Sequence, residues 1–201
     1  ALQRFREALA ANQIDIAREL DLIQFWYGAL LARAGEHGAA IEHLERVVDP
    51  AGELLSQTGP EPQLDGPHAL AWSYLRTGAT AKATALLSIL WQQCQLEAAD
   101  AVPRDSAFLH YCAETALLSG DVDEALAWLE RAVAAGWRDY YLRQNDPYWA
   151  AVEDDPRFRA QMEIVRKDID RQRAEIARID AAEDFVAKVD AAMAARKSTK
   201  R

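Results

Sequence analysis

The feature that most restricts how this chain can fold is a pattern of small residues and glycine that occurs three times, 42–43 residues apart. Each copy has a small residue, an apolar residue, a glycine, an alanine and two further apolar residues at fixed steps. The copies are Gly28, Leu31, Gly35, Ala40, Leu44 and Val47; Ala71, Tyr74, Gly78, Ala83, Leu87 and Leu90; and Ala113, Ala116, Gly120, Ala125, Leu129 and Ala132. A period of this length is typical of proteins built from stacked repeats.

The residues around each glycine predict a pair of antiparallel helices. Apolar residues at helical spacing precede the glycine, which adopts the left-handed backbone of a helix C-cap without strain. After Gly120, Asp121 is a predicted N-cap, and Glu124 follows it at capping-box spacing. The small residue of each first helix should face the alanine of the second, as Gly28 would face Ala40. The other apolar positions need a neighbouring hairpin to bury them, so we expect an all-α solenoid of helix hairpins.

These hairpins resemble the tetratricopeptide repeat (TPR), whose signature positions match the three sets of residues given above. The resemblance implies a protein-protein interaction module in which the first helix of each hairpin lines a concave groove. The spacing of 42–43 residues exceeds the family period of about 34 residues, and units two and three lack the proline expected after the second helix. Longer second helices or loops must absorb the difference.

The repeat also sets the expected organisation of the chain. In order, we expect a partial preceding repeat (1–20), three hairpins within 20–136 (20–49, 66–99 and 105–135) and a C-terminal cap with a long helix and a basic tail (137–201). Residues 50–67 hold four prolines and three glycines, which predicts a long loop, either a surface insertion or a functional hinge. The partial repeat and a first residue other than methionine lead us to expect a part of a longer protein.

Two Asp-Pro steps in the C-terminal part predict helix starts, because aspartate is a good N-cap and proline suits the first helical turn. Asp146-Pro147 should open a short helix, and Asp155-Pro156 a helix that runs into the 190s. Residues 105–178, with GWRDYY, DP and DDPRF after the third hairpin, resemble the closing part of certain bacterial signalling proteins. The upstream part of those proteins is a winged-helix DNA-binding domain, a class III nucleotide cyclase or a protein kinase. The resemblance implies a sensory or regulatory role.

The long helix is expected to carry two apolar stripes. The first consists of Phe158, Met162, Val165, Ile169, Ile176 and Ile179, and the second of Ala182, Val186, Val189 and Met193. We expect the first stripe to cover the last hairpin, as the end of a repeat array requires. Three possibilities remain for the second: it folds back, it pairs with another copy through residues 180–195 as a short coiled coil, or it frays.

The net charge of −9 argues against a nucleic-acid-binding surface. Residues 1–156 carry −13 and residues 157–201 carry +4, so the acidic body is expected to attract a basic protein or peptide partner. The basic end, from Arg196 to Arg201, is predicted to be a solvated tail. No apolar run approaches the roughly 18 residues of a membrane span, so we expect none in this segment.

We expect neither enzymatic activity nor a cofactor or metal. The sequence has no phosphate-loop, dinucleotide, zinc-protease or nucleophile-elbow motif, and His37 and His43 do not share a helical face. Cys94 and Cys112 lack metal-binding spacing. Buried free thiols are the favoured interpretation, and a disulfide across a helix pair is the alternative in an oxidising compartment. The bacterial cytoplasm and the periplasm both stay open as locations.

The candidate partner site is the expected groove. Positions carried over unit by unit from the resemblance include Phe25, Arg33, His68, Trp72, Arg76, His110 and Glu114. Aromatic anchors and a few polar groups would hold a peptide there. The alternative is that Phe25 and Trp72 belong to the hairpin core. A second hypothesis for function is a structural spacer or dimerisation module that uses the long C-terminal helix.

Overall fold

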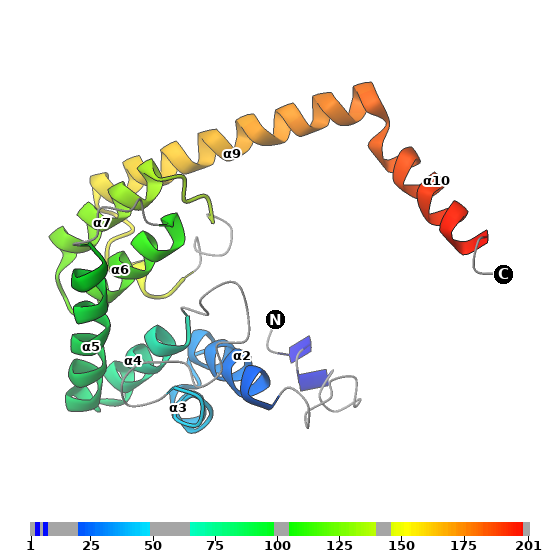
Figure 1. Ribbon diagram of the computed structural model, residues 1–201. Helices are drawn as coiled ribbons and strands as arrows, with labels where there is room; N and C mark the ends of the chain where they lie inside the picture. Colours follow the sequence, from blue (N-terminus) through cyan, green and yellow to red (C-terminus); the bar gives the residue numbers. More distant parts are fainter. Residues whose placement is uncertain are drawn as a thin grey trace.

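The computed structural model describes residues 3–4, 6–7, 20–48, 65–98, 105–139 and 146–198. Within these ranges the protein is all-α and has no β-strand (Figure 1). The helices are α2 (Leu20–Arg33), α3 (His37–Leu44), α4 (Asp65–Thr77), α5 (Thr80–Ala98), α6 (Ser106–Leu118), α7 (Val122–Ala134), the 3₁₀ turn η1 (Trp149–Ala151), α9 (Pro156–Glu183) and α10 (Phe185–Ser198). The predicted half-repeat 1–20 and the predicted loop 50–67 lie largely outside the described residues.

The three predicted bends share one geometry. Gly35, Gly78 and Gly120 have φ angles of 82°, 80° and 89°, where an L side chain is strained. At each bend the glycine N–H bonds to the carbonyl three residues back, and the next N–H bonds to the carbonyl five residues back. This is the Schellman ending of a helix. The prediction that these glycines occupy equivalent bends is confirmed.

Two of the predicted helix starts have their caps. The Asp121 carboxylate accepts a hydrogen bond from the N–H of Glu124 at 3.0 Å. Asp155 accepts one from the N–H of Arg157 at 2.8 Å, with a proline in the first turn. Each cap satisfies an amide that the helix itself leaves without an acceptor. After Asp146 the chain forms only the short 3₁₀ turn η1 rather than an α-helix.

The apolar positions of the repeat are buried in all three hairpins. At Gly28 the helices approach so closely that a side-chain carbon would lie 2.6 Å from Cγ of Leu44. Glycine therefore permits the contact between α2 and α3. The sequence predicts that Gly28 faces Ala40, but its nearest neighbour is Leu44. The two helices therefore cross about one turn further along α3 than expected.

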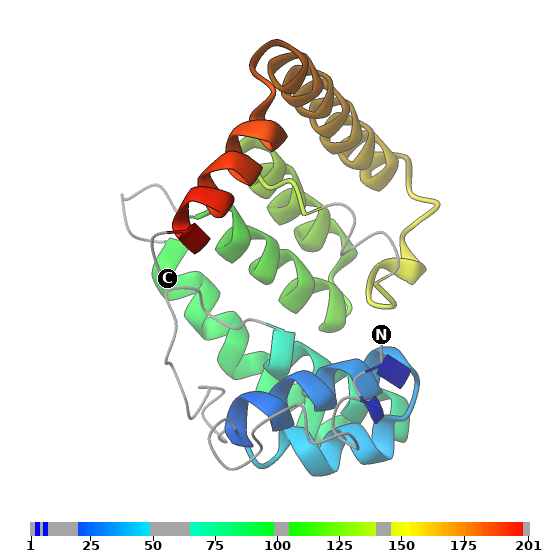
Figure 2. The same ribbon diagram turned by 90° about the vertical axis from the view of Figure 1, so that its right-hand side faces the viewer.

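The helices pack in chain order. α2 packs on α3, α4 on α5 and α6 on α7, while α3 also contacts α4 and α5 contacts α6. The first helices of the hairpins contact one another as well, α2 against α4 and α4 against α6. Figures 1 and 2 show the hairpins following one another from α2 and α3 at one end to α6 and α7 at the other. Side chains of α2, α4 and α6 therefore share one surface.

A polar contact ties the first hairpin to the second. Glu45, just after α3, accepts hydrogen bonds from the Tyr74 hydroxyl at 2.6 Å and the Lys82 ammonium at 2.7 Å. The bonds from Lys82 and Tyr74 lower the pKa of Glu45. Burial, together with the bond to Glu45, raises the pKa of Tyr74 above that of a free tyrosine. These three side chains form a clamp between the hairpins.

The first half of α9 covers the third hairpin, as expected. The residues of the first apolar stripe that pack there are Phe158, Met162, Val165 and Ile169. Arg138, just after α7, forms an ion pair with Asp168 of α9. Hydrogen bonds from Arg138 and Arg171 lower the pKa of Asp168 to about 2.

The rest of the C-terminal part differs from the prediction. Ile176 and Ile179 are exposed, so the stripe does not cover the hairpin along its whole length. The helix also does not run unbroken into the 190s: α9 ends at Glu183, and Asp184 has a left-handed φ of 47° before α10. Aspartate tolerates this conformation better than most residues. In Figure 1, α9 extends past the rest of the body, and α10 leaves it at an angle. Among the described helices, none has both the length and the hydrophobicity to cross a membrane.

Candidate functional site

The predicted groove residues lie on α2, α4 and α6, but four of them are in the interior. Phe25, His68, His110 and Glu114 are each exposed by 3% or less. The prediction that these four line an open groove is therefore wrong. They are buried because α2, α4 and α6 pack against one another and because two tryptophans cover the ring of His110.

Phe25 belongs to the core between the first two hairpins. Its ring packs on Gly66 in α4, where any side-chain carbon would overlap the ring. It also meets Trp26 edge-on, with ring centroids 5.3 Å apart. For Phe25 the alternative interpretation, a core residue, is confirmed.

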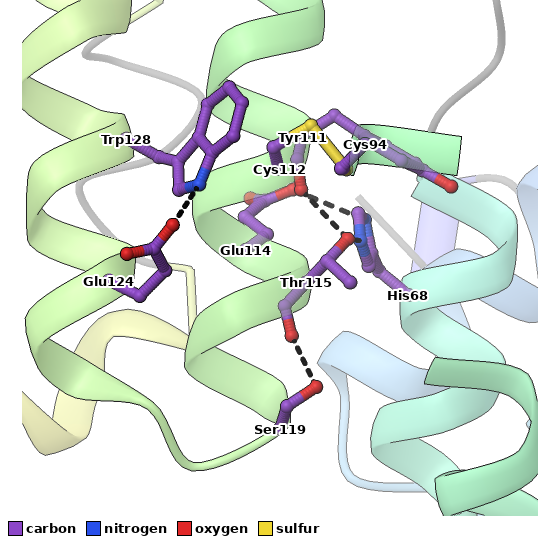
Figure 3. Close-up of a disulfide and its surroundings, with 9 residues drawn as sticks. All are labelled: His68, Cys94, Tyr111, Cys112, Glu114, Thr115, Ser119, Glu124 and Trp128. Carbon is purple, nitrogen blue, oxygen red and sulfur yellow. Dashed lines mark hydrogen bonds and ion pairs between the residues drawn. A yellow bond between two sulfur atoms is a disulfide. The ribbon is translucent and has the colours of Figure 1, made fainter. Parts of the chain in front are cut away.

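A buried polar network joins the second and third hairpins (Figure 3). Nε2 of His68, from α4, lies 2.8 Å from Oγ1 of Thr115 in α6. Because the Thr115 hydroxyl donates its proton to the carbonyl of Tyr111, it accepts the bond from His68. Nδ1 of His68 faces Oε2 of Glu114 at 3.4 Å, a contact that needs a proton on one of the two groups. Such a polar partner is what makes a buried carboxyl group tolerable.

His110 approaches the other oxygen of the same carboxyl group. Its Nδ1 lies 3.7 Å from Oε1 of Glu114. The His110 ring stacks on Trp137, with centroids 4.2 Å apart and planes 6° apart, and Trp149 lies against it at 5.7 Å. His68 and His110 occupy equivalent positions in successive repeats, and the fold brings both to one buried glutamate.

Three other predicted residues remain accessible on this surface. Trp72 is partly buried, and the guanidinium of the exposed Arg76 lies 5.3 Å from its ring centroid. His37 meets Trp72 edge-on at 6.2 Å, and its pKa is lowered by burial and by Arg76. We call Arg33, His37, Trp72 and Arg76 the cationic-aromatic patch. Its charges and ring suit a partner that brings carboxylates and aromatic side chains.

The segment 146–152 lies across the same surface and contacts all three first helices. The contacts are Asp146 to Arg33 (3.6 Å between O and N), Tyr148 to Trp72 (5.8 Å between ring centroids) and Trp149 to His110 (5.7 Å). The buried residues of this segment thus complete the surface that α2, α4 and α6 begin.

Cys94 of α5 and Cys112 of α6 form a disulfide, with Cα atoms 5.7 Å apart (Figure 3). The favoured interpretation from the sequence, two free thiols, is therefore wrong, because the packing of α5 on α6 brings the two side chains together. Both cysteines are fully buried. The cross-link spans 18 residues and lies beside the network of His68, so it holds the second and third hairpins together at that point.

The sequence does not predict the buried polar network or the position of the segment 146–152. The equivalent positions of His68 and His110, with Glu114 one helical turn after His110, are the one signal in the sequence that indicates the network. No signal places the segment 146–152 over α2, α4 and α6. Among the described residues, no three His, Cys, Asp or Glu side chains are placed to hold a metal ion. In the comparisons with known proteins, no family model, no curated protein and no solved structure matches this chain.

Proposed function

We propose that the chain is a protein-interaction module built as an α-solenoid of TPR-like hairpins. Three observations support this architecture: equivalent glycine bends, equivalent buried positions in each hairpin, and helices that pack in chain order. Among the described residues, each hairpin packs on the hairpin next to it, and the third also packs on α9, as neighbouring units of a repeat array do.

The partner binds on the surface that the first helices share, at the cationic-aromatic patch, whose residues come from α2, the start of α3 and α4. The observation that carries this proposal is the accessible pair of Arg76 and Trp72 on α4, with the partly exposed Arg33 on α2, since arginine and tryptophan are among the side chains that most often anchor interfaces. The net charge attracts a basic protein at long range, whereas the patch itself favours acidic and aromatic groups at contact.

The module acts as the regulatory part of a larger bacterial signalling protein, as the resemblance of residues 105–178 suggests. Binding of the partner at the patch then favours one of two states of an attached effector, by as much as the partner's affinities for the two states differ. This chemistry is non-covalent and requires no cofactor.

A peptide library displayed on phage and selected on the full chain tests this function. We expect selected peptides to lose at least about tenfold in affinity for Arg76→Ala, because the variant removes one charged anchor. Arg131→Ala is the matched control, since Arg131 lies in the same way over Trp128, at 3.9 Å, but on α7. If peptides bind both variants equally, or if no peptide is selected, the patch is not the site.

A second candidate function is self-association through the C-terminal helices. The observation in its favour is that Ile176, Ile179, Val186, Val189 and Met193 are exposed along α9 and α10. Light scattering on the chain with and without residues 180–201 tests it. A dimer that becomes a monomer on truncation supports this function, and a monomer in both cases excludes it.

A further inference from the structure

The segment 146–152 contacts the first helix of each hairpin in turn. Its contacts run from Arg33 in α2 through Trp72 in α4 to His110 in α6. A ligand laid across the stacked first helices would meet them in the same order. The segment therefore has the position that the proposed function gives to a partner.

The segment is folded by its own hydrogen bonds. The N–H of Tyr148 donates to the Asp146 side chain at 3.1 Å, and the N–H of Trp149 to the Asp146 carbonyl at 3.2 Å. The N–H of Val152 donates to the carbonyl of Trp149 at 3.0 Å. The contacts given above with α2, α4 and α6 are made by side chains. Displacing this turn would leave the backbone of α2, α4 and α6 unchanged, and it would separate the ring of Trp149 from that of Phe158 in α9, whose centroids lie 5.3 Å apart.

Two of its contacts differ from those of a permanent core. The Asp146 side chain is fully buried, but its partner Arg33 keeps 27% of its side chain exposed. The cation therefore stays within reach of another carboxylate. Among the described residues, the buried indole N–H of Trp149 has no hydrogen-bond acceptor, although a buried tryptophan usually has one.

We propose that the segment 146–152 is an internal ligand, which occupies the partner surface in the unbound protein and is displaced when a partner binds. This rests on the proposed function and adds the chemistry of the partner. The partner carries a turn with a carboxylate followed two and three residues later by aromatic rings, the spacing of the internal ligand. The carboxylate pairs with Arg33, and the rings pack on Trp72 and His110.

The test uses the full chain and a labelled synthetic peptide of residues 146–155, blocked at both ends so that it carries no terminal charges. Asp146→Asn weakens the internal ion pair but leaves Arg33 for the peptide, and asparagine keeps the acceptor for the N–H of Tyr148. Arg33→Gln breaks the same ion pair and removes the anchor of the peptide. We expect the Asp146→Asn chain to bind the peptide about tenfold more tightly than the wild-type chain, because apparent affinity rises with the fraction of open chains. The Arg33→Gln chain should show no gain.

A purely structural role of the segment gives a different result. Both variants lose one ion pair, so they would be destabilised alike and would bind the peptide alike. Equal peptide affinities in two chains that far-UV circular dichroism shows to be folded would overturn the proposal.

Hydrogen exchange on the wild-type chain gives a second test that needs no variant. A large excess of the peptide should speed the exchange of the amides of Trp149 and Val152. The displaced segment loses the packing that shields its internal hydrogen bonds from water. Unchanged exchange would contradict the proposal. The two proposals can fail separately. Phage-selected peptides that bind at Arg76 would support the proposed function. If the 146–155 peptide then neither competes with them nor binds the Asp146→Asn chain, the internal-ligand proposal is wrong.

Discussion

The side chains of His68 in α4 and Thr115 in α6 lie 2.8 Å apart in the interior, so a hydrogen bond joins the second hairpin to the third. The hydrophobic contacts between the two hairpins are non-directional. A directional bond in a medium of low dielectric constant permits one register. A second hydrogen bond follows in the same helix: the Ser119 hydroxyl donates to the carbonyl of Thr115 at 2.8 Å.

Removing the partner of His68 should destabilise the fold. Thr115→Val keeps the shape of the side chain but leaves Nε2 of His68 without its acceptor. We expect the free energy of unfolding to fall by about 1–3 kcal/mol, the cost of a buried polar group that loses its hydrogen bond. Urea denaturation followed by circular dichroism measures this. The control is Ser119→Ala, at the more exposed end of α6, which should cost less than about 1 kcal/mol. Equal losses would contradict the role given to the network.

Reduction of the disulfide should lower stability without loss of helix. The bond between Cys94 and Cys112 closes a loop of 18 residues, for which chain entropy predicts about 3 kcal/mol. A reductant should therefore shift the urea midpoint of the wild-type chain downward. The double variant Cys94→Ala/Cys112→Ala should unfold at a low midpoint and show no response to the reductant. A wild-type midpoint that does not change on full reduction would speak against this contribution.

The contribution of Glu45 to stability should disappear in acid. Because hydrogen bonds from Lys82 and Tyr74 lower its pKa, its contribution is present above the ordinary glutamate value of 4.5 and is lost as the pH falls through the lowered value. Glu45→Gln should cost less than about 1 kcal/mol at pH 7, since solvent screens this partly exposed group. The difference between variant and wild type should shrink below pH 4.5 in urea titrations at several pH values. A difference in the free energy of unfolding between variant and wild type that grows on acidification would contradict a lowered pKa of Glu45.

A side chain at a glycine bend should destabilise the protein, whereas one at a glycine within a helix should not. Gly78→Ala places a Cβ at a φ of 80° and should cost about 1–2 kcal/mol. Gly38→Ala is the matched control: Gly38 lies in α3, and a Cβ there meets no atom within 4 Å. It should stabilise the protein by less than about 0.5–1 kcal/mol, the helix-propensity gain for a mid-helix position, because Gly38 lies in the first turn of α3. Thermal melts of both variants check the two signs, and a stabilising Gly78→Ala would remove the argument for the bends.

The parts of the fold that depend on residues close to one another in the sequence could be predicted. Gly78 and Asp121 act on amides and carbonyls within five positions, so their roles can be read from the pattern. The burial of His110 cannot, because Trp149 reaches it from 39 residues further along the chain. The pairing of Cys94 likewise depends on how α5 packs on α6, which no local pattern encodes.

The candidate site shows the same division. Arg33, Trp72 and Arg76 were placed on the first helices by the repeat register, and they lie there. Which positions stay accessible is decided by the packing of α2, α4 and α6 and by the segment 146–152. The break at Asp184 also escapes sequence reasoning, since neither glycine nor proline marks it.

The central claim, that a partner binds over α2, α4 and α6, is tested most directly by the indole N–H signals in a ¹⁵N NMR spectrum of the chain with a phage-selected peptide. Trp72 lies on that surface, and Trp128 lies on α7, where its indole N–H donates to Glu124. Each signal is assigned from a Trp→Phe variant. We predict that the Trp72 signal moves on binding and that the Trp128 signal does not. A shift of Trp128 with an unmoved Trp72 would contradict the account.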